Sequence, residues 1–305
     1  MKKKIIIQIP CLNEQSTIGK VIKDLKKVLK NAEIVVYDNF STDNTVKEAK
    51  KHGAKVVLEK KKGKGNVVKR MFSDNFDANI YVMIDGDHTY DTSKIKQSID
   101  ILYGEKYDML VAKRIHSDPS AYRRGHVIGN QMFSHFVNYI FGNDISDIFS
   151  GYRIFSKRFI KTFPQNSNEF EVEAELTIHA LEQGFKVGEF ECLYKPRPEG
   201  SVSKLSTFKD GMKILRLILI LIKDEKPLLF FSILSIFFII LSLAIGIPII
   251  KEFYITGLVE RLPSAILAGL FSVLSFLSFF CGLILDVMKK IRFENKKMNY
   301  LLFKE

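Results

Sequence analysis

The sequence contains no tryptophan, and its 305 residues include only three cysteines and six histidines. Cys11, Cys192 and Cys281 are widely spaced, without a Cys-x-x-Cys pair or a Cys/His cluster, and the histidines show no metal-ligand spacing. Disulfide frameworks and structural zinc sites both depend on such clusters. The sequence therefore predicts neither of them, and it fits a reducing compartment.

Several glycine-rich motifs of nucleotide-binding proteins and hydrolases are also missing. The chain has no GxxxxGK[ST] loop and no GxSxG turn, and residues 63–68 (GKGNVV) lack the third glycine of a dinucleotide fingerprint. The chemistries that depend on these motifs are not predicted for this chain.

Acidic residues are fewer than basic ones. There are 34 Asp and Glu against 46 Lys and Arg, which gives a formal net charge of +12. Such an excess favours a polyanionic partner, namely nucleic acid, an anionic membrane surface or a phosphorylated substrate, and charge alone does not choose among them. With 47% hydrophobic residues, the chain can form one large core, or one core with an appendage.

Strand and helix patterns alternate through the first two hundred residues. Residues 4–9 are a basic-flanked apolar run too short for a signal peptide, and we interpret them as a first strand. Further strands are predicted at 33–37, 54–58, 79–84, 108–113 and 184–194, with helices at 18–29, 63–72, 93–102, 127–141 and 168–183. This alternation predicts an α/β fold with a mostly parallel sheet and helices on both faces.

The composition changes near residue 206. Residues 206–226 mix charged and long aliphatic side chains, which predicts an amphipathic helix in a membrane interface. Uncharged runs at 228–250 and 264–285 are each long enough for the roughly 20 residues that cross a bilayer. The alternative is a buried hairpin, but a soluble core does not need two such uninterrupted spans. We therefore expect two transmembrane helices.

Basic residues flank the outer ends of these two runs, whereas the short connection at 251–261 carries charges of both signs. The positive-inside rule then predicts a multi-pass protein of the cytoplasmic (inner) membrane, with both termini in the cytoplasm. Contact with anionic headgroups would account for part of the net charge. The predicted organisation is an α/β domain at 1–205, an interfacial helix at 206–226, two transmembrane helices within 227–287 and a basic cytoplasmic tail at 288–305.

Polar motifs follow several of the predicted strands. Asp85 and Asp87 end the strand at 79–84, and residues 10–14, 38–43 and 60–66 also lie at strand-to-helix edges. Each has an ordinary explanation as a turn, a helix cap or a solvated face. Together they predict a carboxylate-rich pocket beside a basic, glycine-flanked loop, which suits a nucleoside diphosphate bound through a divalent metal.

The motifs also occur in the order of a known family. The sequence resembles the nucleotide-sugar half of family 2 glycosyltransferases with the Rossmann-like GT-A fold. With the two C-terminal apolar runs, it is similar to polyprenyl-phosphate glycosyltransferases of the bactoprenol glucosyltransferase and dolichol-phosphate mannose synthase type. The resemblance covers about residues 4–287 and rests on 10–14 (PCLNE), 36–43 (VYDNFSTD), 63–66 (GKGN), 85–87 (DGD), 150–155 (SGYRIF), 170–175 (FEVEAE) and 197–204 (RPEGSVSK).

The resemblance implies roles for the residues of a donor site. Pro10, Asn13 and Glu14 would shape the pocket for the base and ribose, Asp38 would contact the uracil or guanine edge, and Lys64 would lie near the diphosphate. Asp85 would face the ribose or a metal-bound water, and Asp87 would ligate Mg²⁺ or Mn²⁺. The chain departs from the family pattern at His88, where a third acidic residue is usual.

The same resemblance implies an isoprenoid phosphate as acceptor, which needs cations to bind it. The candidates are Arg114, Arg123, Arg124, Arg153 and Lys204, because guanidinium and ammonium groups suit phosphate oxygens. Arg153 and Lys204 are preferred, since they lie in family-like motifs. Arg123 and Arg124 fit the solvated face of a loop equally well.

Four glutamates, Glu169, Glu171, Glu173 and Glu175, lie in the helix predicted at 168–183. They fit an exposed helix face. They also fit a functional role in which Glu173 orients the donor sugar or the attacking phosphate. A phosphate oxygen is largely ionised at neutral pH, given a second pKa of about 6, so no strong general base is required.

The predicted function is inverting transfer of one sugar from a UDP- or GDP-linked donor to a polyprenyl phosphate, expected to be undecaprenyl phosphate, at the cytoplasmic membrane face. One alternative is a membrane glycosyltransferase that acts on a glycan or another lipid, although the Gln-x-x-Arg-Trp motif of processive synthases is excluded by the lack of tryptophan. Another is a non-catalytic membrane adaptor that binds a nucleotide. Nucleic acid is not an expected partner, and a homo-oligomer is possible, although no GxxxG seam argues for one.

Overall fold

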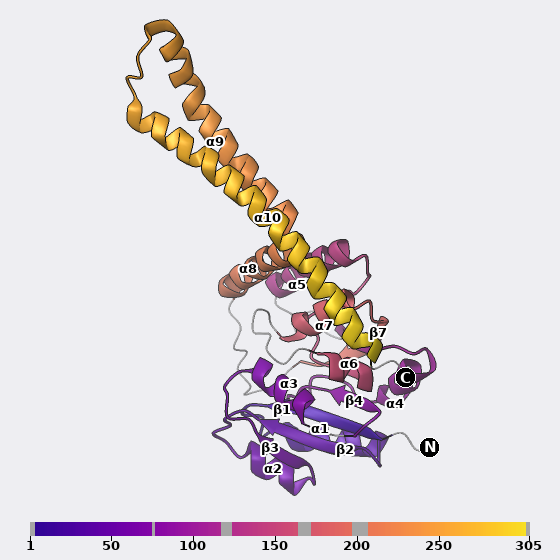
Figure 1. Cartoon of the computed structure of the whole chain (residues 1–305). Helices are drawn as coiled ribbons and strands as arrows, with labels where there is room; N and C mark the ends of the chain where they lie inside the picture. The colour runs from indigo at the N-terminus through magenta and orange to yellow at the C-terminus, as the bar shows by residue number, and fades with distance from the viewer. Residues whose placement is uncertain (1–3, 75–76, 117–123, 164–171, 197–206, 303–305) are drawn as a thin grey trace. The chain divides into compact units, whose positions relative to one another are not determined.

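The computed structural model describes residues 4–74, 77–116, 124–163, 172–196 and 207–302 (Figure 1). Contacts divide the chain into two compact units. The first comprises Met1–Ile214 with Lys296–Glu305, and the second comprises Leu215–Asn295.

Helices and strands alternate in the first unit, as the sequence predicts. In chain order the elements are β1 (Ile5–Cys11), α1 (Ile18–Val28), β2 (Glu33–Asp38), α2 (Thr45–Lys51), β3 (Lys55–Leu58), α3 (Lys64–Ser73), β4 (Ile80–Met83), α4 (Ile95–Gly104), β5 (Met109–His116), α5 (Arg124–Phe141), β6 (Arg153–Ser156), α6 (Lys157–Thr162), α7 (Val172–Glu182) and β7 (Val187–Tyr194).

The strands form one seven-stranded sheet in the order β3-β2-β1-β4-β6-β5-β7. The pairs β1–β2, β1–β4, β2–β3 and β5–β7 are parallel, and only β6 runs antiparallel to its neighbours β4 and β5. The predicted α/β fold with a mostly parallel sheet is therefore confirmed. Strand β6 was not expected, because its four residues, of which the first three are buried, carry no alternating pattern.

Side-chain alternation along the strands separates two cores, one on each face of the sheet. Ile7 and Ile9 of β1 belong to the core that α1, α2 and α4 cover. Ile6 of the same strand belongs to the core that α3, α6 and α7 cover. The helices thus lie on both faces, and the polar strand ends are left at the edges of the sheet.

The carboxyl ends of β1, β2 and β4 meet at one edge, because these strands are parallel and in register. Cys11 at the end of β1 pairs with Asp38 at the end of β2, and Gln8 pairs with Met83 of β4. The motifs that follow these strands are thereby brought together, at the edge where open α/β sheets bind their ligands.

The second unit consists mainly of helices. Helix α8 (Thr207–Glu225) enters it, and α9 (Pro227–Thr256) and α10 (Leu262–Leu302) form an antiparallel hairpin (Figure 1). Pro227–Thr256 and Leu262–Met298 are candidate membrane spans, and their most apolar windows are only 6% and 17% buried. Such low burial is the opposite of what a core helix of a soluble protein would show.

Hydroxyl groups join the two helices of this hairpin. Ser235 Oγ lies 2.9 Å from Ser275 Oγ, and Ser242 Oγ donates to the carbonyl of Ala268 at 2.8 Å. Polar side chains are common contacts between helices in a bilayer. Helix α9 extends past the predicted span and stops at Gly257, whose φ of 70° is left-handed, and α10 continues into the basic segment expected as a tail.

Candidate active site

Lys64 joins two carboxylates that are far apart in the sequence. Its Nζ lies 2.7 Å from Asp85 Oδ1, just after β4, and 2.6 Å from Glu173 Oε1 on α7. Burial alone would lower the pKa of Lys64, but Asp85 and Glu173 outweigh it and raise that pKa well above its usual value. Three residues that the sequence proposes from separate motifs therefore form one charged cluster.

Helix α7 is buried, including its glutamates. Glu173 is 8% exposed and Glu175 is 6% exposed, and every residue from Val172 to Ala180 is buried. An exposed helix face, one of the two alternatives raised by the sequence, is therefore wrong for these two residues. Glu169 and Glu171 lie outside the described residues.

Gly151 gives Asp85 the space it needs. A Cβ at position 151 would lie 2.2 Å from Asp85 Oδ2, closer than real Cβ contacts. The N–H of Gly151 donates to Tyr90 Oη at 2.9 Å, and the Tyr90 hydroxyl also contacts Ser150 Oγ. The sequence gives no role to Gly151 or Tyr90. The only signal is that Gly151 lies within the motif at 150–155 and that Tyr90 follows the motif at 85–87 by three residues.

Asp87 is less accessible than Asp85. It is 6% exposed, and its Oδ1 accepts from the backbone N–H of Thr89 at 3.2 Å and from Thr89 Oγ1 at 2.6 Å. One oxygen of Asp87 thus stabilises the turn after β4, which is the ordinary role of an aspartate at a strand end. The side chain of Asp85 is 24% exposed.

Carboxylates surround Cys11 at the end of β1. Burial raises the pKa of the Cys11 thiol well above its usual value, and the nearby carboxylates Glu14, Asp38, Asp85 and Asp87 raise it further. The thiol stays protonated at neutral pH, so Cys11 is not a nucleophile. Its surroundings also show that the predicted donor-site carboxylates lie around one point.

The loops after β1 and β2 hold each other in place. Asn13, at a φ of 58°, accepts the N–H of Thr42 through Oδ1 and donates its own N–H to Ser41 Oγ. The N–H of Glu14 donates to Thr45 Oγ1 at 2.8 Å. Pro10, one residue before the end of β1, pairs with Tyr37. Pro10, Asn13 and Glu14, the residues predicted to contact the base and ribose, therefore lie at one edge of the sheet, where hydrogen bonds connect the two loops.

Asp38 has an unsatisfied oxygen. Its side chain is 4% exposed, and Oδ2 accepts the N–H of Ser41 at 3.2 Å. Oδ1 is buried and has no hydrogen-bond partner within the described part of the chain. A buried acceptor without a donor is costly, so this oxygen marks a place where a ligand can donate.

A divalent metal fits this edge only with help from a ligand. No three His, Cys, Asp or Glu side chains among the described residues are grouped to hold a metal by themselves. Asp85 and Asp87 offer hard carboxylate oxygens, and Mg²⁺ is commonly held by one or two carboxylates together with substrate phosphates. In this structure the Lys64 ammonium supplies the positive charge beside Asp85.

His88 is the residue at which the chain departs from the family pattern. Its side chain contacts helix α1 and not the carboxylates of Asp85 and Asp87. Its Nε2 lies 3.0 Å from Asp24 Oδ2 of α1, and its φ is 61°. Hydrogen bonding to His88 is the main cause that lowers the pKa of Asp24. The side chain therefore ties the turn after β4 to α1.

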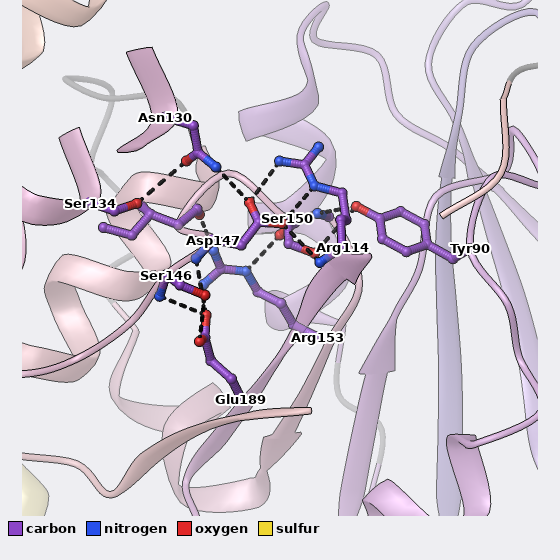
Figure 2. A network of polar contacts seen from close by, with 11 residues as sticks. Tyr90, Arg114, Asn130, Ser134, Ser146, Asp147, Ser150, Arg153 and Glu189 are labelled. Carbon is purple, nitrogen blue, oxygen red and sulfur yellow. Dashed lines mark hydrogen bonds and ion pairs between the residues drawn. The ribbon is translucent and has the colours of Figure 1, made fainter. Parts of the chain in front are cut away.

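Arg114, a predicted phosphate ligand, is paired with a carboxylate. Its Nε and Nη2 donate to the two oxygens of Asp147 at 2.7 Å each, and Asn130 also donates to Asp147 (Figure 2). Burial would raise the pKa of Asp147, but the hydrogen bonds and charge of Arg114 lower it overall. The charge of Arg114 is thus largely neutralised within the protein.

Arg153 lies beneath the site instead of on its surface. It is fully buried, and its guanidinium donates to the carbonyl of Ser150 (Figure 2). The guanidinium also donates to the carbonyl of Ile148 and to Thr177 Oγ1 of α7. Burial lowers the pKa of Arg153 to about 10, so it is still charged at neutral pH. This position does not suit the predicted direct contact with an acceptor phosphate. Strand alternation turns Arg153 toward α7.

The remaining predicted acceptor residues cannot be placed. Arg123 and Lys204 lie outside the described residues, and Arg124 begins α5 with a side chain that the structure does not describe.

Residues 6–163, more than half of the chain, match the sequence model of glycosyl transferase family 2. The chain belongs to glycosyl transferase family 2. This confirms the family that the ordered motifs indicate. The matched range contains Lys64 and Asp85, and Glu173 lies beyond it.

Two relatives that are named as transferases cover most of the chain. Glycosyltransferase AglJ of Haloferax volcanii is 28% identical over 295 residues, which is 96% of each chain. Dolichyl-phosphate hexose transferase of the same organism is 26% identical over 202 residues, 66% of this chain and 86% of the relative. The similarity to AglJ extends through the region of α9 and α10.

The fold agrees with a solved glycosyltransferase structure. Glucosyl-3-phosphoglycerate synthase from Mycobacterium tuberculosis, in complex with Mn²⁺, uridine diphosphate and glucosyl-3-phosphoglycerate, has a TM-score of 0.54 and 21% identity. The match covers 73% of this chain and 80% of that one. The family 2 domain therefore has the GT-A fold, as predicted.

Proposed function

We propose that this family 2 glycosyltransferase transfers a single sugar, with inversion, from a UDP- or GDP-linked donor to a polyprenyl phosphate at the cytoplasmic membrane face. The observation that carries the proposal is the cluster of Asp85, Lys64 and Glu173 at the carboxyl edge of parallel strands. A sugar diphosphate is polyanionic, and Lys64 is a partly exposed cation at that edge whose pKa is raised well above its usual value by Asp85 and Glu173. The relative named dolichyl-phosphate hexose transferase supports an isoprenoid phosphate as acceptor.

Asp38 would select the base. Its unsatisfied Oδ1 requires a donor. Uracil and guanine each carry a ring N–H on their pairing edge, whereas adenine and cytosine present a ring acceptor there, which would face the carboxylate unfavourably. Pro10, Asn13 and Glu14 would complete the pocket for the base and ribose.

Lys64 would act on the diphosphate. Moving its ammonium from Asp85 to the departing phosphate oxygens would stabilise the charge that develops as the glycosidic bond breaks. A Mg²⁺ or Mn²⁺ ion, when bound, would be held by Asp85 and Asp87 and would supply further positive charge to that diphosphate. Glu173, released from Lys64, would then be placed to orient a sugar hydroxyl or the attacking phosphate.

The acceptor would arrive from the membrane. In this proposal, residues 1–205 form the catalytic domain, 206–226 lie in the interface, and the two helices within 227–287 cross the bilayer with both termini in the cytoplasm. Arg123, Arg124 and Lys204 are then the candidates to bind the acceptor phosphate, because Arg114 is neutralised by Asp147 and Arg153 is buried.

The test uses the full-length protein in detergent with undecaprenyl phosphate and a panel of sugar nucleotides, and it detects lipid-linked product by mass spectrometry. One UDP- or GDP-sugar should yield a singly glycosylated lipid with wild type. Asp87→Asn should lower the rate by at least about 10²-fold, since the oxygens that would hold the metal are weakened. Absence of lipid-linked product with every sugar nucleotide would contradict the lipid acceptor, and full activity in Asp87→Asn would contradict the metal assignment.

A further inference from the structure

Phe40, in the turn after β2, has a backbone conformation that suits glycine. Its φ is 64°, in the left-handed region that bulky side chains rarely adopt. Residues held in this region tend to occur at ligand-binding sites, where the surrounding structure maintains them. The ring is also 47% exposed, so burial of the ring does not account for a phenylalanine at this position.

Hydrogen bonds on both sides of Phe40 hold the turn in this conformation. Asp38 Oδ2 accepts the N–H of Ser41. Asn39 donates to the carbonyls of Glu59 and Lys61, and its Oδ1 accepts the N–H of Gly63. The turn is therefore fixed to the loop that leads into Lys64.

In the sequence, Phe40 lies between Asp38, which is proposed to bind the base, and Lys64, which is proposed to bind the diphosphate. Asp38, with its unsatisfied buried Oδ1, precedes it by two residues. The ammonium of Lys62 lies 5.4 Å from the ring centroid, in the loop that precedes Lys64. An exposed aromatic ring is thus held two residues after the proposed acceptor for a base, with the ammonium of Lys62 near its face.

We propose that Phe40 is a specificity-determining residue for the donor, and that its ring packs on the face of the base whose ring N–H is accepted by Asp38. This inference rests on the proposed function, because it requires a nucleotide donor. Aromatic side chains stack on bases of any sequence, so Phe40 would supply affinity while Asp38 supplies the choice of base. Packing of the ring on a base would explain why a phenylalanine occupies a backbone position that favours glycine.

The experiment compares full-length wild type with Phe40→Tyr, Phe40→Ala and Phe40→Gly in detergent. Affinities for UDP, GDP and inorganic pyrophosphate are measured by calorimetry in the presence of Mn²⁺, and melting temperatures are recorded without ligand. Phe40→Tyr keeps the ring and should bind like wild type. Phe40→Ala and Phe40→Gly should both bind the preferred nucleoside diphosphate about tenfold more weakly, a loss typical of one stacking contact.

Two comparisons separate the ring from the backbone. Pyrophosphate has no base, so its affinity should be the same in all four proteins. Phe40→Gly should melt at a higher temperature than Phe40→Ala, because only glycine adopts the left-handed conformation without strain. Nucleotide binding that is unchanged in Phe40→Ala and Phe40→Gly, or an equal loss of pyrophosphate binding, would overturn the role of Phe40.

Failure of the proposed function would look different. If wild type bound neither UDP nor GDP with Mn²⁺, both proposals would fall. If wild type bound one of them and the ring-deleted variants bound it equally well, only the inference about Phe40 would fall.

Discussion

Asp85 and Asp87 follow the same strand, yet their carboxylates have different surroundings. Asp85 is partly exposed, is paired with Lys64, and occupies space that exists only because residue 151 is glycine. Asp87 is buried, and one of its oxygens holds the turn through Thr89. Replacing Asp87 therefore tests the turn as well as the chemistry, whereas Gly151 offers a way to disturb Asp85 without changing any charge.

We predict that Gly151→Ala lowers transferase activity by about 10²-fold, the effect expected of a displacement near 1 Å at a reacting centre. The added Cβ would meet Asp85 Oδ2 at 2.2 Å, so the carboxylate of Asp85 and residue 151 cannot both keep their positions, which disturbs the contact of Asp85 with Lys64. The measurement is kcat and KM for sugar transfer to undecaprenyl phosphate.

Gly104→Ala is the matched control, because a Cβ at that position in α4 meets nothing within 4 Å. It should keep wild-type kinetics. Equal activity in both alanine variants would show that the position of Asp85 is not important for transfer.

At the scale of elements, β6 and the turn before it connect the two halves of the site. Arg153 of β6 donates to the carbonyls of Ile148 and Ser150, which shapes the turn that carries Gly151. The same guanidinium donates to Thr177 of α7, one helical turn after Glu173. Arg153 is thus placed to position both Asp85 and Glu173 without contacting a substrate.

We predict that Thr177→Val destabilises the protein by about 1–3 kcal/mol, because it leaves a buried, charged donor of Arg153 without its acceptor while keeping the side-chain shape. Thr177 is fully buried, and its Oγ1 lies 2.8 Å from Arg153 Nη1. Thermal unfolding of the full-length protein in detergent is the measurement, with kcat recorded alongside.

Ser98→Ala is the control, since the buried Ser98 hydroxyl donates only to the carbonyl of Lys94 in its own helix. It should cost less, near the net value of about 1 kcal/mol for an ordinary hydrogen bond. If both variants had the same melting temperature, the hydrogen bond between Arg153 and Thr177 would not hold α7 against the turn that carries Gly151.

The elements also show what the sequence could predict. Strands such as β1, β2 and β4 are apolar runs with turn residues behind them, so their order, and the meeting of Asp38 with Asp85 and Asp87 at one edge, follow from local patterns. Strand β6 and the burial of Glu173 depend on partners distant in the sequence. Arg153 was expected to bind the acceptor phosphate because a cationic side chain in a motif suggests an anion, and nothing local reveals that carbonyls and Thr177 surround it.

At the scale of the whole molecule, charge and apolar surface are distributed unevenly. Helices α9 and α10 carry the candidate membrane spans, and Glu225, at the end of α8, is buried against Lys289 and Arg292 of α10. Glu225 is itself buried, so removing its cationic partners would leave a buried carboxylate without a compensating charge, which is destabilising. The stability of the helical unit therefore depends on ionised side chains. The stability of the α/β unit depends instead on a histidine that stays neutral.

That neutral group is His179 of α7. Its ring packs edge-on against Phe159, Phe163 and Phe185, with centroid distances of 5.3–5.7 Å, and its Nδ1 has no partner within the described chain. Burial and, to a smaller extent, the nearby charge of Lys296 together lower the pKa of His179 to about 3, while Glu182 opposes the shift. An unfolded histidine has a pKa of about 6.5.

Between these two values the unfolded state binds a proton that the folded state does not. We therefore predict that His179 contributes stability fully above about pH 6.5 and that this contribution is lost as the pH falls toward 3, by at most about 1.4 kcal/mol per pH unit. Carboxylates titrate in the lower part of the same window, so melting temperatures in detergent should be compared between wild type and His179→Phe from pH 7.5 to 4. The shared carboxylates cancel in the difference, and wild type should lose stability more steeply than the variant below pH 6.5, because phenylalanine keeps the aromatic contacts and cannot take up a proton. Parallel profiles would mean that His179 is protonated as readily in the folded protein as in the unfolded chain.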